Sequence, residues 1–331
     1  MFILVLAEKW THKRDLWTGG RSTSRQENLG RAIRAFHRLF LSRVFFEFFA
    51  GLDIDITEKS YYSPIPDTKV LAKQDPWEKR SELVGINMNI EKQLRLLEEV
   101  FPRYRQECDF PVKKTSVPHE FCLTNPFFGL QPAAILHCMI RHFKPRTIVE
   151  VGAGNSTYVS ARACLMNQKD GNISDLVAIE PYPNDILKRG FPGLSTLITK
   201  KVEEVPLSFF SRLAENDILF IDSSHVARIG NDVPFLYLEV LPRLSKRVLV
   251  HIHDIFFPCE YPKDWVLRDR RFYSEQYILQ AFLCFNRTYE VLFSNYYMNL
   301  RFPDKMESVF RTPREFREYH FPSSFWMKKI L

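Results

Sequence analysis

Short apolar runs alternate with helical stretches in the second half of the chain. Four of these runs are rich in β-branched residues, at positions 147–151, 176–180, 217–222 and 247–253. Two later runs, at 289–298 and 323–331, have the character of strands that pair with each other at a sheet edge. Because strands that alternate with helices form βαβ units, this pattern predicts an α/β domain built on a doubly wound parallel sheet.

The first half of the chain has a different pattern. Residues 11–30 are polar and contain two adjacent glycines, which predicts a loose arm. Helical periodicity then covers residues 35–52, where we expect an amphipathic helix packed on the domain. The stretch YYSPIPD (61–67) contains two prolines, which predict an extended path with turns. Residues 83–107 again predict an amphipathic helix, with Ile90, Leu94, Leu97 and Val100 near one face.

Two further helices are predicted within the α/β region. One covers residues 125–143 and ends before Lys144 and Pro145, and the other lies near residues 273–286. We therefore expect an N-terminal arm and helical lid over residues 1–119, followed by one α/β domain over residues 120–331.

Composition narrows the class of protein. The chain has 331 residues, of which 45% are hydrophobic and 14% aromatic, so it can bury a large core and is not disordered. The net charge of +7 favours anionic partners such as nucleic acid, phosphorylated substrates or an acidic membrane surface. Residues 1–43 hold nine Lys or Arg against three Asp or Glu. Because no nucleic-acid-binding motif is visible, we expect nucleic acid to be an unlikely partner.

Cysteine usage and hydrophobic segments bear on the compartment. No two of the six cysteines form a CxxC pair, which argues against a disulfide framework or a zinc site and favours reduced thiols in the cytoplasm. The opening MFILVLA is too short an apolar run for a signal peptide. Arg38, Arg43 and Glu47 interrupt residues 35–52, so we expect no transmembrane segment, with a membrane-surface helix as the alternative to a packed one.

Chemically distinctive residues follow the apolar runs, where ligands bind in an open parallel sheet. The first run is followed by Gly152-Ala153-Gly154-Asn155-Ser156-Thr157, and Glu180 ends the second. The sequence Asp222-Ser223-Ser224-His225 ends the third of these runs, and His251-Ile252-His253-Asp254 ends the last of the four. Glycines let the backbone approach a ligand, and Asn155 or Ser156 can cap the next helix.

The glycine turn and the acid after the second run suit a dinucleotide or S-adenosylmethionine. A dinucleotide fingerprint has a third glycine where this chain has Thr157, and a pyrophosphate would be repelled by the nearby Glu150. A methionine moiety, in contrast, carries an ammonium group that a carboxylate can hold. Glu180 is placed to accept hydrogen bonds from ribose hydroxyls. The residues therefore favour a nucleoside with a cationic tail, and a nicotinamide-dependent enzyme is the weaker alternative.

Four motifs in this order, VEVGAGNST, AIEPYP, DILFIDSSH and HIHDIFFP, resemble class I S-adenosylmethionine-dependent methyltransferases. The resemblance extends from about residue 60 to the end and is greatest to a bacterial subgroup with an upstream YYSPIPD and a late Glu275-Gln276-Tyr277. It implies a Rossmann-like, doubly wound sheet of seven strands in the order 3-2-1-4-5-7-6, with the last strand antiparallel. It also implies that S-adenosyl-L-methionine is the cofactor.

The resemblance assigns roles to individual residues. Glu180 would bind the ribose hydroxyls, Asp222 would lie at the methyl-transfer end, and Lys201–Glu204 would lie near the adenine. The residues that it places around the methionine and ribose, or in the turn beside them, are Glu150, Gly152, Gly154, Asn155 and Ser156.

Two versions of the catalytic chemistry remain open. Asp222 and Asp254 would end neighbouring strands, and such carboxylates can bind Mg²⁺ as in the similar catechol-type and macrolide-type O-methyltransferases. This chain departs from both types, because Ile255 follows the last aspartate and His253 precedes it. Without a metal, His225 or His253 would act as general base, since imidazole titrates near neutral pH.

A methyl acceptor needs alignment and the loss of a proton, and a hydroxyl needs a base more than an amine does. We therefore expect a cytoplasmic enzyme that methylates a hydroxyl of a small molecule or saccharide, with a monomer and a homo-oligomer both left open. Tyr61, Tyr62 and the aromatic loop 256–265 would either line the acceptor pocket or simply pack. The alternatives are a nucleic-acid methyltransferase and a catalytically inactive S-adenosylmethionine-binding protein.

Overall fold

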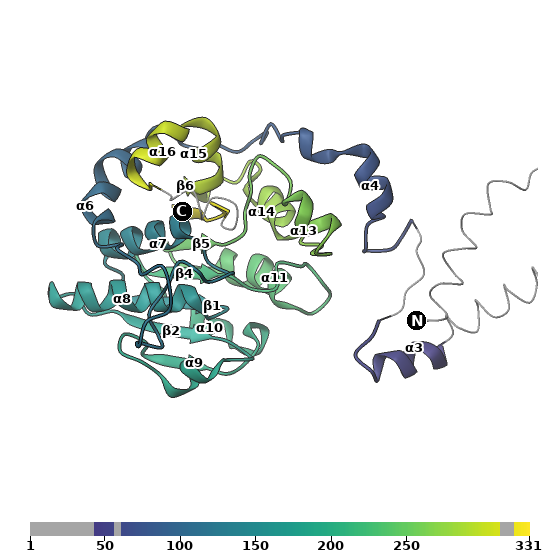
Figure 1. Cartoon of the computed structure of the whole chain (residues 1–331), viewed down its shortest axis with the longest axis horizontal. Coiled ribbons are helices and arrows are strands. Elements are labelled where there is room, and N and C mark those ends of the chain that lie inside the picture. The colour runs from purple at the N-terminus through teal and green to yellow at the C-terminus, as the bar shows by residue number, and fades with distance from the viewer. Residues whose placement is uncertain (1–42, 56–60, 312–320) are drawn as a thin grey trace, which may run out of the picture. The chain divides into compact units, whose positions relative to one another are not determined.

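The computed structural model describes residues 43–55, 61–311 and 321–331, and the chain divides into two compact units, residues 1–67 and 68–331 (Figure 1). The described part of the smaller unit contains helix α3 (Arg43–Ala50). The rings of Tyr61 and Tyr62 contact each other edge to face and are almost fully exposed. The expected arm at residues 11–30 and the first part of the helix expected at 35–52 lie outside the described residues.

Seven strands form a single sheet in the larger unit, in the predicted order β3-β2-β1-β4-β5-β7-β6. The strands are β1 (Thr147–Val151), β2 (Asp175–Ile179), β3 (Thr196–Ile198), β4 (Ile218–Ile221), β5 (Leu249–Ile252), β6 (Tyr289–Ser294) and β7 (Phe325–Lys329). β1 to β5 pair in parallel, and β7 pairs antiparallel with both β5 and β6. The predicted Rossmann-like fold is confirmed, including its antiparallel last strand.

Two details of the sheet differ from the sequence prediction. The run at 289–298 is a strand only as far as Ser294, because helix α15 (Asn295–Arg301) begins at the next residue. The third strand of the sheet, β3, was not located from the sequence. It has three residues that are only partly buried or exposed, so no apolar run marks it.

The helices of the larger unit begin later than the periodicity predicted. The helix expected at 83–107 starts at Ile90 and ends at Arg105. It consists of α5 (Ile90–Arg95), η3 (Leu96–Val100) and α6 (Phe101–Arg105). Leu83, Gly85 and Asn89 before it have φ angles of +51°, +78° and +48°, which are incompatible with a helix. The helix expected at 125–143 is α7 (Leu130–Phe143), and the one near 273–286 is α14 (Glu275–Leu283). None of the helices in the described residues is long and apolar enough to cross a membrane.

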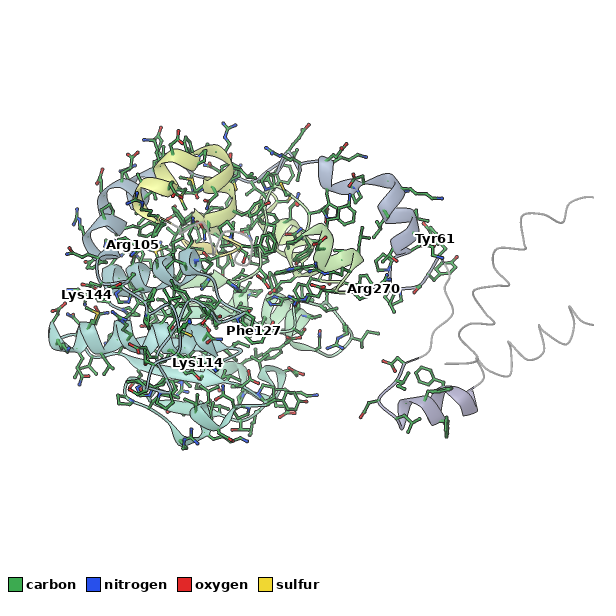
Figure 2. All side chains as sticks on the ribbon, viewed as in Figure 1. Tyr61, Arg105, Lys114, Phe127, Lys144 and Arg270 are labelled. Atoms are coloured by element: carbon green, nitrogen blue, oxygen red, sulfur yellow. The ribbon has the colours of Figure 1, made fainter. Side chains whose placement is uncertain are left out.

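The other helical segments of the larger unit are α4 (Thr68–Gln74), η2 (Pro76–Glu78), α8 (Asn155–Lys169), α9 (Asp185–Arg189), η4 (Val202–Glu204), α10 (Leu207–Phe210), α11 (Asp232–Pro234), η5 (Phe235–Val240), α12 (Leu241–Arg243), α13 (Lys263–Leu267) and α16 (Pro303–Val309). Helix α4 is tied to the rest of the larger unit by Arg270, whose guanidinium donates to the Thr68 hydroxyl at 2.6 Å (Figure 2).

Each face of the sheet is covered by its own helices and its own apolar core. One core contains residues of η3, α6, α7, α8, α15 and α16, and the other contains residues of α10, η5, α12 and α14. Side chains alternate between the two faces along each strand. In β1, Ile148 belongs to the first core and Val149 and Val151 to the second, so Glu150 points toward the face that α7 and α8 cover.

The segment before α7 belongs to this core rather than to a separate layer. Leu97 and Phe101 are fully buried, and the Phe101 ring lies 5.0 Å from that of Phe293 and 5.4 Å from that of Phe310. Residues 68–119 are thus part of the larger unit, although the sequence analysis assigned them to a lid. The predicted boundary at 119/120 and the function of these residues as a lid stay predictions.

Candidate active site

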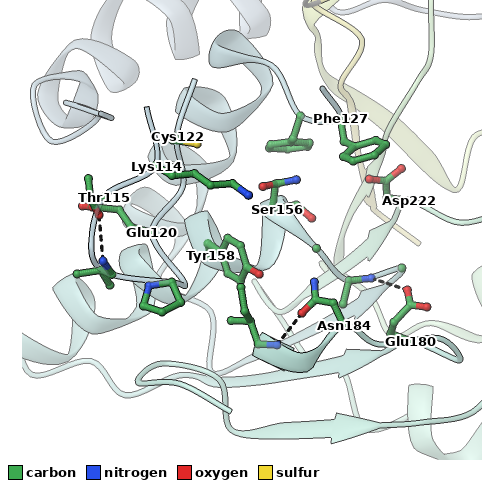
Figure 3. Close-up of a pocket in the computed structure, with 18 residues that line it drawn as sticks. Lys114, Thr115, Glu120, Cys122, Phe127, Ser156, Tyr158, Glu180, Asn184 and Asp222 are labelled. Carbon is green, nitrogen blue, oxygen red and sulfur yellow. Dashed lines mark hydrogen bonds between the residues drawn. The ribbon is translucent and has the colours of Figure 1, made fainter. Parts of the chain in front are cut away.

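Two cavities lie at the carboxyl ends of the central parallel strands. The first cavity has a volume of 740 Å³ (Figure 3), and the second has a volume of 610 Å³. Both are lined by Gly152, Glu180 and Asp222, which follow β1, β2 and β4. The three positions are those that the sequence singled out. The strand order thus brings residues that are up to 70 positions apart to one edge of the sheet.

Gly152 is required by a close backbone approach. Its φ is +83°, and a Cβ atom placed on it would lie 1.8 Å from the carbonyl oxygen of Asp222. Gly154 differs, because a Cβ atom there would have no neighbour within 4 Å, and the residue lines the first cavity. The first glycine is therefore needed for the fold of the site, and the second leaves its backbone open to a ligand.

Glu150 lies beneath the turn between β1 and α8. It is fully buried, and its Oε1 accepts hydrogen bonds from Ser156 Oγ at 2.5 Å and Thr157 Oγ1 at 3.1 Å. Its Oε2 has no partner among the described residues. Burial raises the pKa of the Glu150 carboxyl to about 8, against the opposing hydrogen bonds. Glu150 is not a lining residue of either cavity, so it reaches them through Ser156, which does line the first.

Glu180 connects the first two strand ends. Its Oε2 accepts a hydrogen bond from the Ala153 amide at 3.1 Å (Figure 3), and its Oε1 accepts one from the Tyr182 amide at 2.8 Å. Each carboxylate oxygen has a further lone pair for a hydroxyl donor. Glu180 can therefore hold the glycine turn and bind a ligand in the cavities at the same time.

The adenine position implied by the resemblance also lies at a cavity. The second cavity is lined by Lys201, which directly precedes η4, and by Val202 and Glu203 within η4. Ser223 also lines it. Asn155 lines the first cavity at the start of α8.

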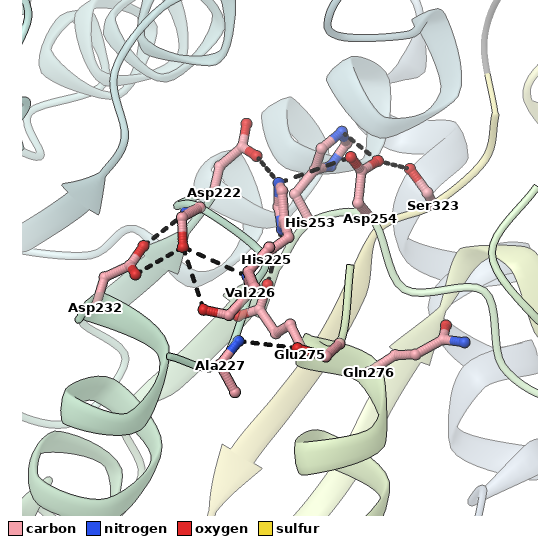
Figure 4. Close-up of polar contacts among 12 residues, drawn as sticks. Asp222, His225, Val226, Ala227, Asp232, His253, Asp254, Glu275, Gln276 and Ser323 are labelled. Atoms are coloured by element: carbon pink, nitrogen blue, oxygen red, sulfur yellow. Dashed lines mark hydrogen bonds and ion pairs between the residues drawn. The ribbon is translucent and has the colours of Figure 1, made fainter. Parts of the chain in front are cut away.

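Asp222, His225 and Asp254 form a charged cluster after β4 and β5 (Figure 4). The His225 Nε2 lies 3.2 Å from Asp222 Oδ1 and 3.7 Å from Asp254 Oδ2. Burial would raise the pKa of the Asp222 carboxyl, but the nearby His253 and the hydrogen bond from His225 outweigh it and lower this pKa. Asp222 is thus kept ionised at the junction of the two cavities.

A third carboxylate holds the other side of the His225 ring. Its Nδ1 lies 2.8 Å from Oε2 of Glu275, which is fully buried at the first residue of α14. Burial opposes the charged ring, but the hydrogen bonds to Asp222 and Glu275 raise the pKa of His225 well above its usual value. An imidazole whose two nitrogens both face carboxylates is a proton donor on both sides, so this geometry argues against His225 as a general base.

His253 has a freer arrangement. The Nε2 of this ring lies 3.6 Å from Asp254 Oδ1, and its Nδ1 has no partner among the described residues. The Phe128 ring, which lines the first cavity, packs 4.7 Å from it. Asp254 also accepts a hydrogen bond from Ser323 Oγ at 2.9 Å. Of the two histidines that were candidates for the base, His253 has a ring nitrogen that makes no hydrogen bond among the described residues, and this atom is buried.

His251, two residues earlier in β5, belongs to the core. It is fully buried, stacks 4.5 Å from the Trp326 ring and contacts Phe220 at 4.2 Å. Burial lowers the pKa of His251 well below its usual value, so the ring is neutral. The aromatic loop after β5 also packs in part, since Phe256 and Tyr261 are almost completely buried.

The residues do not fit the expected magnesium site at Asp222 and Asp254. Magnesium requires near-octahedral oxygen ligands, whereas the ring nitrogens of His225 and His253 lie 3.2 to 3.7 Å from these carboxylates, and Asp254 also accepts a hydrogen bond from the Ser323 hydroxyl. Among the described residues, no group of three or more His, Cys, Asp or Glu side chains has an arrangement that could hold a metal ion.

One wall of the first cavity is formed by residues that come before α7 in the chain, and it was not predicted from the sequence. Lys114, Phe127 and Phe128 line this wall, and the Phe127 ring is 78% exposed (Figure 3). Asn125 fixes the turn, because its amide donates to the carbonyls of Cys122 and Phe128 and its Oδ1 accepts from the amides of Phe127 and Phe128. An asparagine followed by proline was a turn signal that could have placed this wall.

The sequence of this chain is similar to sequences of known proteins. The sequence profile described as a methyltransferase domain matches residues 149–255, which contain all of the strand-end motifs. An uncharacterised protein from Archaeoglobus fulgidus is 35% identical over 168 residues, which are 48% of this chain and 73% of that protein. The chain belongs to the class I S-adenosylmethionine-dependent methyltransferase family.

Solved structures give more distant likenesses to this methyltransferase. The O-methyltransferase TomG from Streptomyces achromogenes, involved in tomaymycin synthesis and solved with S-adenosylmethionine, has 13% identity and a TM-score of 0.37, over 74% of this chain and 97% of that one. An O-methyltransferase from Bacillus cereus, solved with S-adenosylhomocysteine, has 12% identity and a TM-score of 0.34, over 74% and 98% of the two chains.

The two glycines of the turn predict opposite behaviour on substitution. Gly152→Ala places a methyl group against the Asp222 carbonyl at a positive φ, so we expect it to lower the free energy of unfolding by at least about 3 kcal/mol. Gly154→Ala should change it by less than about 1 kcal/mol and instead weaken binding of S-adenosylhomocysteine. Denaturant unfolding and calorimetric titration measure the two effects. Equal loss of stability in both variants would contradict this assignment.

The raised pKa of Glu150 predicts a pH-dependent cost. Between its unfolded value near 4.5 and about 8, the folded methyltransferase holds a proton that the unfolded chain has released, so this residue makes stability fall as pH rises. Glu150→Gln removes this cost. Its free energy of unfolding should rise relative to the unsubstituted chain by up to about 1.4 kcal/mol per pH unit across that window. A difference that is constant from pH 5 to about 8 would show that Glu150 is ionised in the folded state.

Proposed function

We propose that this methyltransferase transfers a methyl group to a hydroxyl of a small molecule or saccharide. The observation that carries the proposal is the junction of the two cavities at Gly152, Glu180 and Asp222. A cofactor with an amino-acid tail and a nucleoside needs two compartments with a shared centre. Asp222 lines this centre, and the neighbouring His253 and Asp254 would supply the acid–base groups.

The residues present fit S-adenosylmethionine. Gly154 leaves open space at the first cavity, and Glu150 has an unpartnered carboxylate oxygen behind Ser156, which suits a cationic tail. In the proposed arrangement, Glu180 accepts the ribose hydroxyls, and Lys201–Glu204 lie near the adenine. The Lys114 ammonium group, which points into the first cavity, would pair with the carboxylate of the tail (Figure 3). When bound, the cofactor supplies a methyl group already activated by its sulfonium.

The protein then has to align the acceptor and remove its proton. His253 is the proposed general base, because its Nδ1 is unpartnered and Asp254 lies beside its other nitrogen. Asp222 would face the methyl-transfer end from the junction of the cavities, and His225 would keep it in position. The exposed Phe127 ring and Phe128 offer an apolar wall for a small acceptor.

A nucleic-acid acceptor is the second candidate, favoured by the net charge of +7 and by the nine basic residues among the first 43. This candidate requires binding of RNA or DNA that weakens steeply with salt. The small-molecule proposal requires no such binding, so a salt series with labelled RNA separates the two.

Cofactor binding tests the first step of the proposal. We expect calorimetric titration to show binding of S-adenosylhomocysteine and none of NAD⁺. Glu180→Gln should weaken S-adenosylhomocysteine binding by about ten- to a hundredfold, because it removes a charged acceptor for the ribose hydroxyls. Asp185→Asn, at a nearby exposed carboxylate, is the matched control and should bind normally. Binding of NAD⁺ alone would exclude the proposed function.

Methyl transfer tests the second step. With S-adenosylmethionine labelled on its methyl group, we expect label to enter compounds from a panel of phenols, sugars and other alcohols, but not RNA. His253→Gln should slow transfer by about 10²–10⁴-fold and leave S-adenosylhomocysteine affinity unchanged, as expected for loss of a general base. Full activity of this variant would exclude His253 as the base, and transfer to RNA alone would favour the nucleic-acid candidate.

A further inference from the structure

Glu275 and His225 form a buried pair that the methyl-transfer chemistry does not itself require. We propose that this pair is a built-in cation that replaces a divalent metal between Asp222 and Asp254, with Glu275 as the positioning residue. The inference rests on the proposed function for its setting, since it concerns how the same site is held together. It assigns a role to Glu275 and predicts that the site needs no metal.

The position of the His225 ring carries the first part of the argument. Its Nε2 lies between one oxygen of Asp222, at 3.2 Å, and one oxygen of Asp254, at 3.7 Å (Figure 4). These carboxylates follow the neighbouring parallel strands β4 and β5, so their negative charges are forced close together. A cation between them relieves this repulsion. The imidazole nitrogen already lies in that position.

The charge of the His225 ring depends on the partner of its other nitrogen. The His225 Nδ1 lies 2.8 Å from Oε2 of Glu275, which is buried with no exposed surface. Ionised carboxylates only accept hydrogen bonds, so a ring placed between Asp222 and Glu275 donates from both nitrogens and carries both protons. Glu275 therefore makes His225 a fixed positive group, in the way that a carboxylate behind a histidine fixes its ring at other sites.

The backbone holds the ring in this place. His225 has a φ of +59°, and its carbonyl oxygen accepts hydrogen bonds from the amides of Ser274 and Glu275 at 2.8 and 3.1 Å. The Ser274 hydroxyl in turn accepts one from the Ala227 amide at 2.9 Å. The loop after β4 is thus fastened to the start of α14 at His225 itself and two residues after it. An unusual conformation that is held from several directions indicates that the position of this side chain is set by the fold.

Gln276, the residue after Glu275, also connects the start of α14 to its surroundings. The Gln276 side chain accepts a hydrogen bond from the Phe256 amide at 3.1 Å, and the Gln276 backbone amide donates to the Tyr261 hydroxyl at 2.9 Å. Gln276 therefore anchors α14 to the loop after β5, while Glu275 reaches the loop after β4. The start of this helix joins the two loops that carry Asp222 and Asp254.

Thermal unfolding with and without divalent ions tests the proposal. The unsubstituted chain should have the same Tm in EDTA and in millimolar Mg²⁺ or Mn²⁺ at equal ionic strength. His225→Ala leaves both carboxylates without their cation, so we expect Mg²⁺ or Mn²⁺ to bind there and raise its Tm by about 3 °C or more. His142→Gln, which changes a partly exposed histidine elsewhere, is the control and should not respond to the ions.

Two further variants keep the test decisive. Adding Asp254→Asn to His225→Ala should abolish the ion response, because one of the two carboxylates is lost. Glu275→Gln keeps the shape of the side chain and removes its charge. We expect it to gain a smaller ion response with His225 still present, a result that a merely structural role for Glu275 would not give. This variant also serves as the test if His225→Ala does not fold.

Two results would overturn the proposal. One is a stabilising effect of Mg²⁺ on the unsubstituted chain, or a loss of S-adenosylhomocysteine affinity of about tenfold in EDTA that Mg²⁺ restores. The other is the absence of any ion response in both His225→Ala and Glu275→Gln. Because Tm is read without cofactor or acceptor, the Tm results are independent of the proposed function. That function fails instead if S-adenosylhomocysteine does not bind under any of the conditions.

Discussion

The close approach of Gly152 to the carbonyl oxygen of Asp222 is the contact on which the rest of the site depends. It brings the ends of β1 and β4 so near that no side chain fits between them. The turn after β1 can therefore continue into α8 with Gly154 open to the first cavity, while Asp222 faces both cavities. A residue with a Cβ atom would separate the two strand ends and with them the two cavities.

Buried charge is the second constraint, and the site handles it in two ways. Glu150 has only hydroxyl donors and no cation, so its pKa rises to about 8 and its proton remains until a positive ligand arrives. Glu275 is also buried, which raises the pKa of its carboxyl, but the hydrogen bond and the charge of His225 act in the opposite direction. A buried carboxylate near a ligand cavity can thus be either a reserve for ligand charge or part of the scaffold, and its partner decides which.

The strand-end positions could be predicted because they follow from local patterns, whereas the sheet order was predicted from the resemblance to class I methyltransferases. Fully buried parallel strands form continuous apolar runs, and ligand residues directly follow them. Short or two-phase segments escaped this reasoning: β3 is too short to form a run, and the segment after Ser294 changes from strand to helix without a polar break. The contacts of Glu275 with His225 could not be predicted, because 50 residues separate them and only the tertiary fold places α14 beside β4 and its loop.

The same tertiary contacts divide the work between the two histidines, which the sequence presents as equivalent candidates. A general base needs a ring nitrogen with a free lone pair at the operating pH. His225 is held as a donor on both nitrogens by Asp222 and Glu275, whereas His253 keeps Nδ1 unpartnered. If His225 were the base, it would have to give up a proton between three carboxylates, which opposes the reaction electrostatically. In the proposed function, charge compensation therefore belongs to His225 and proton removal to His253.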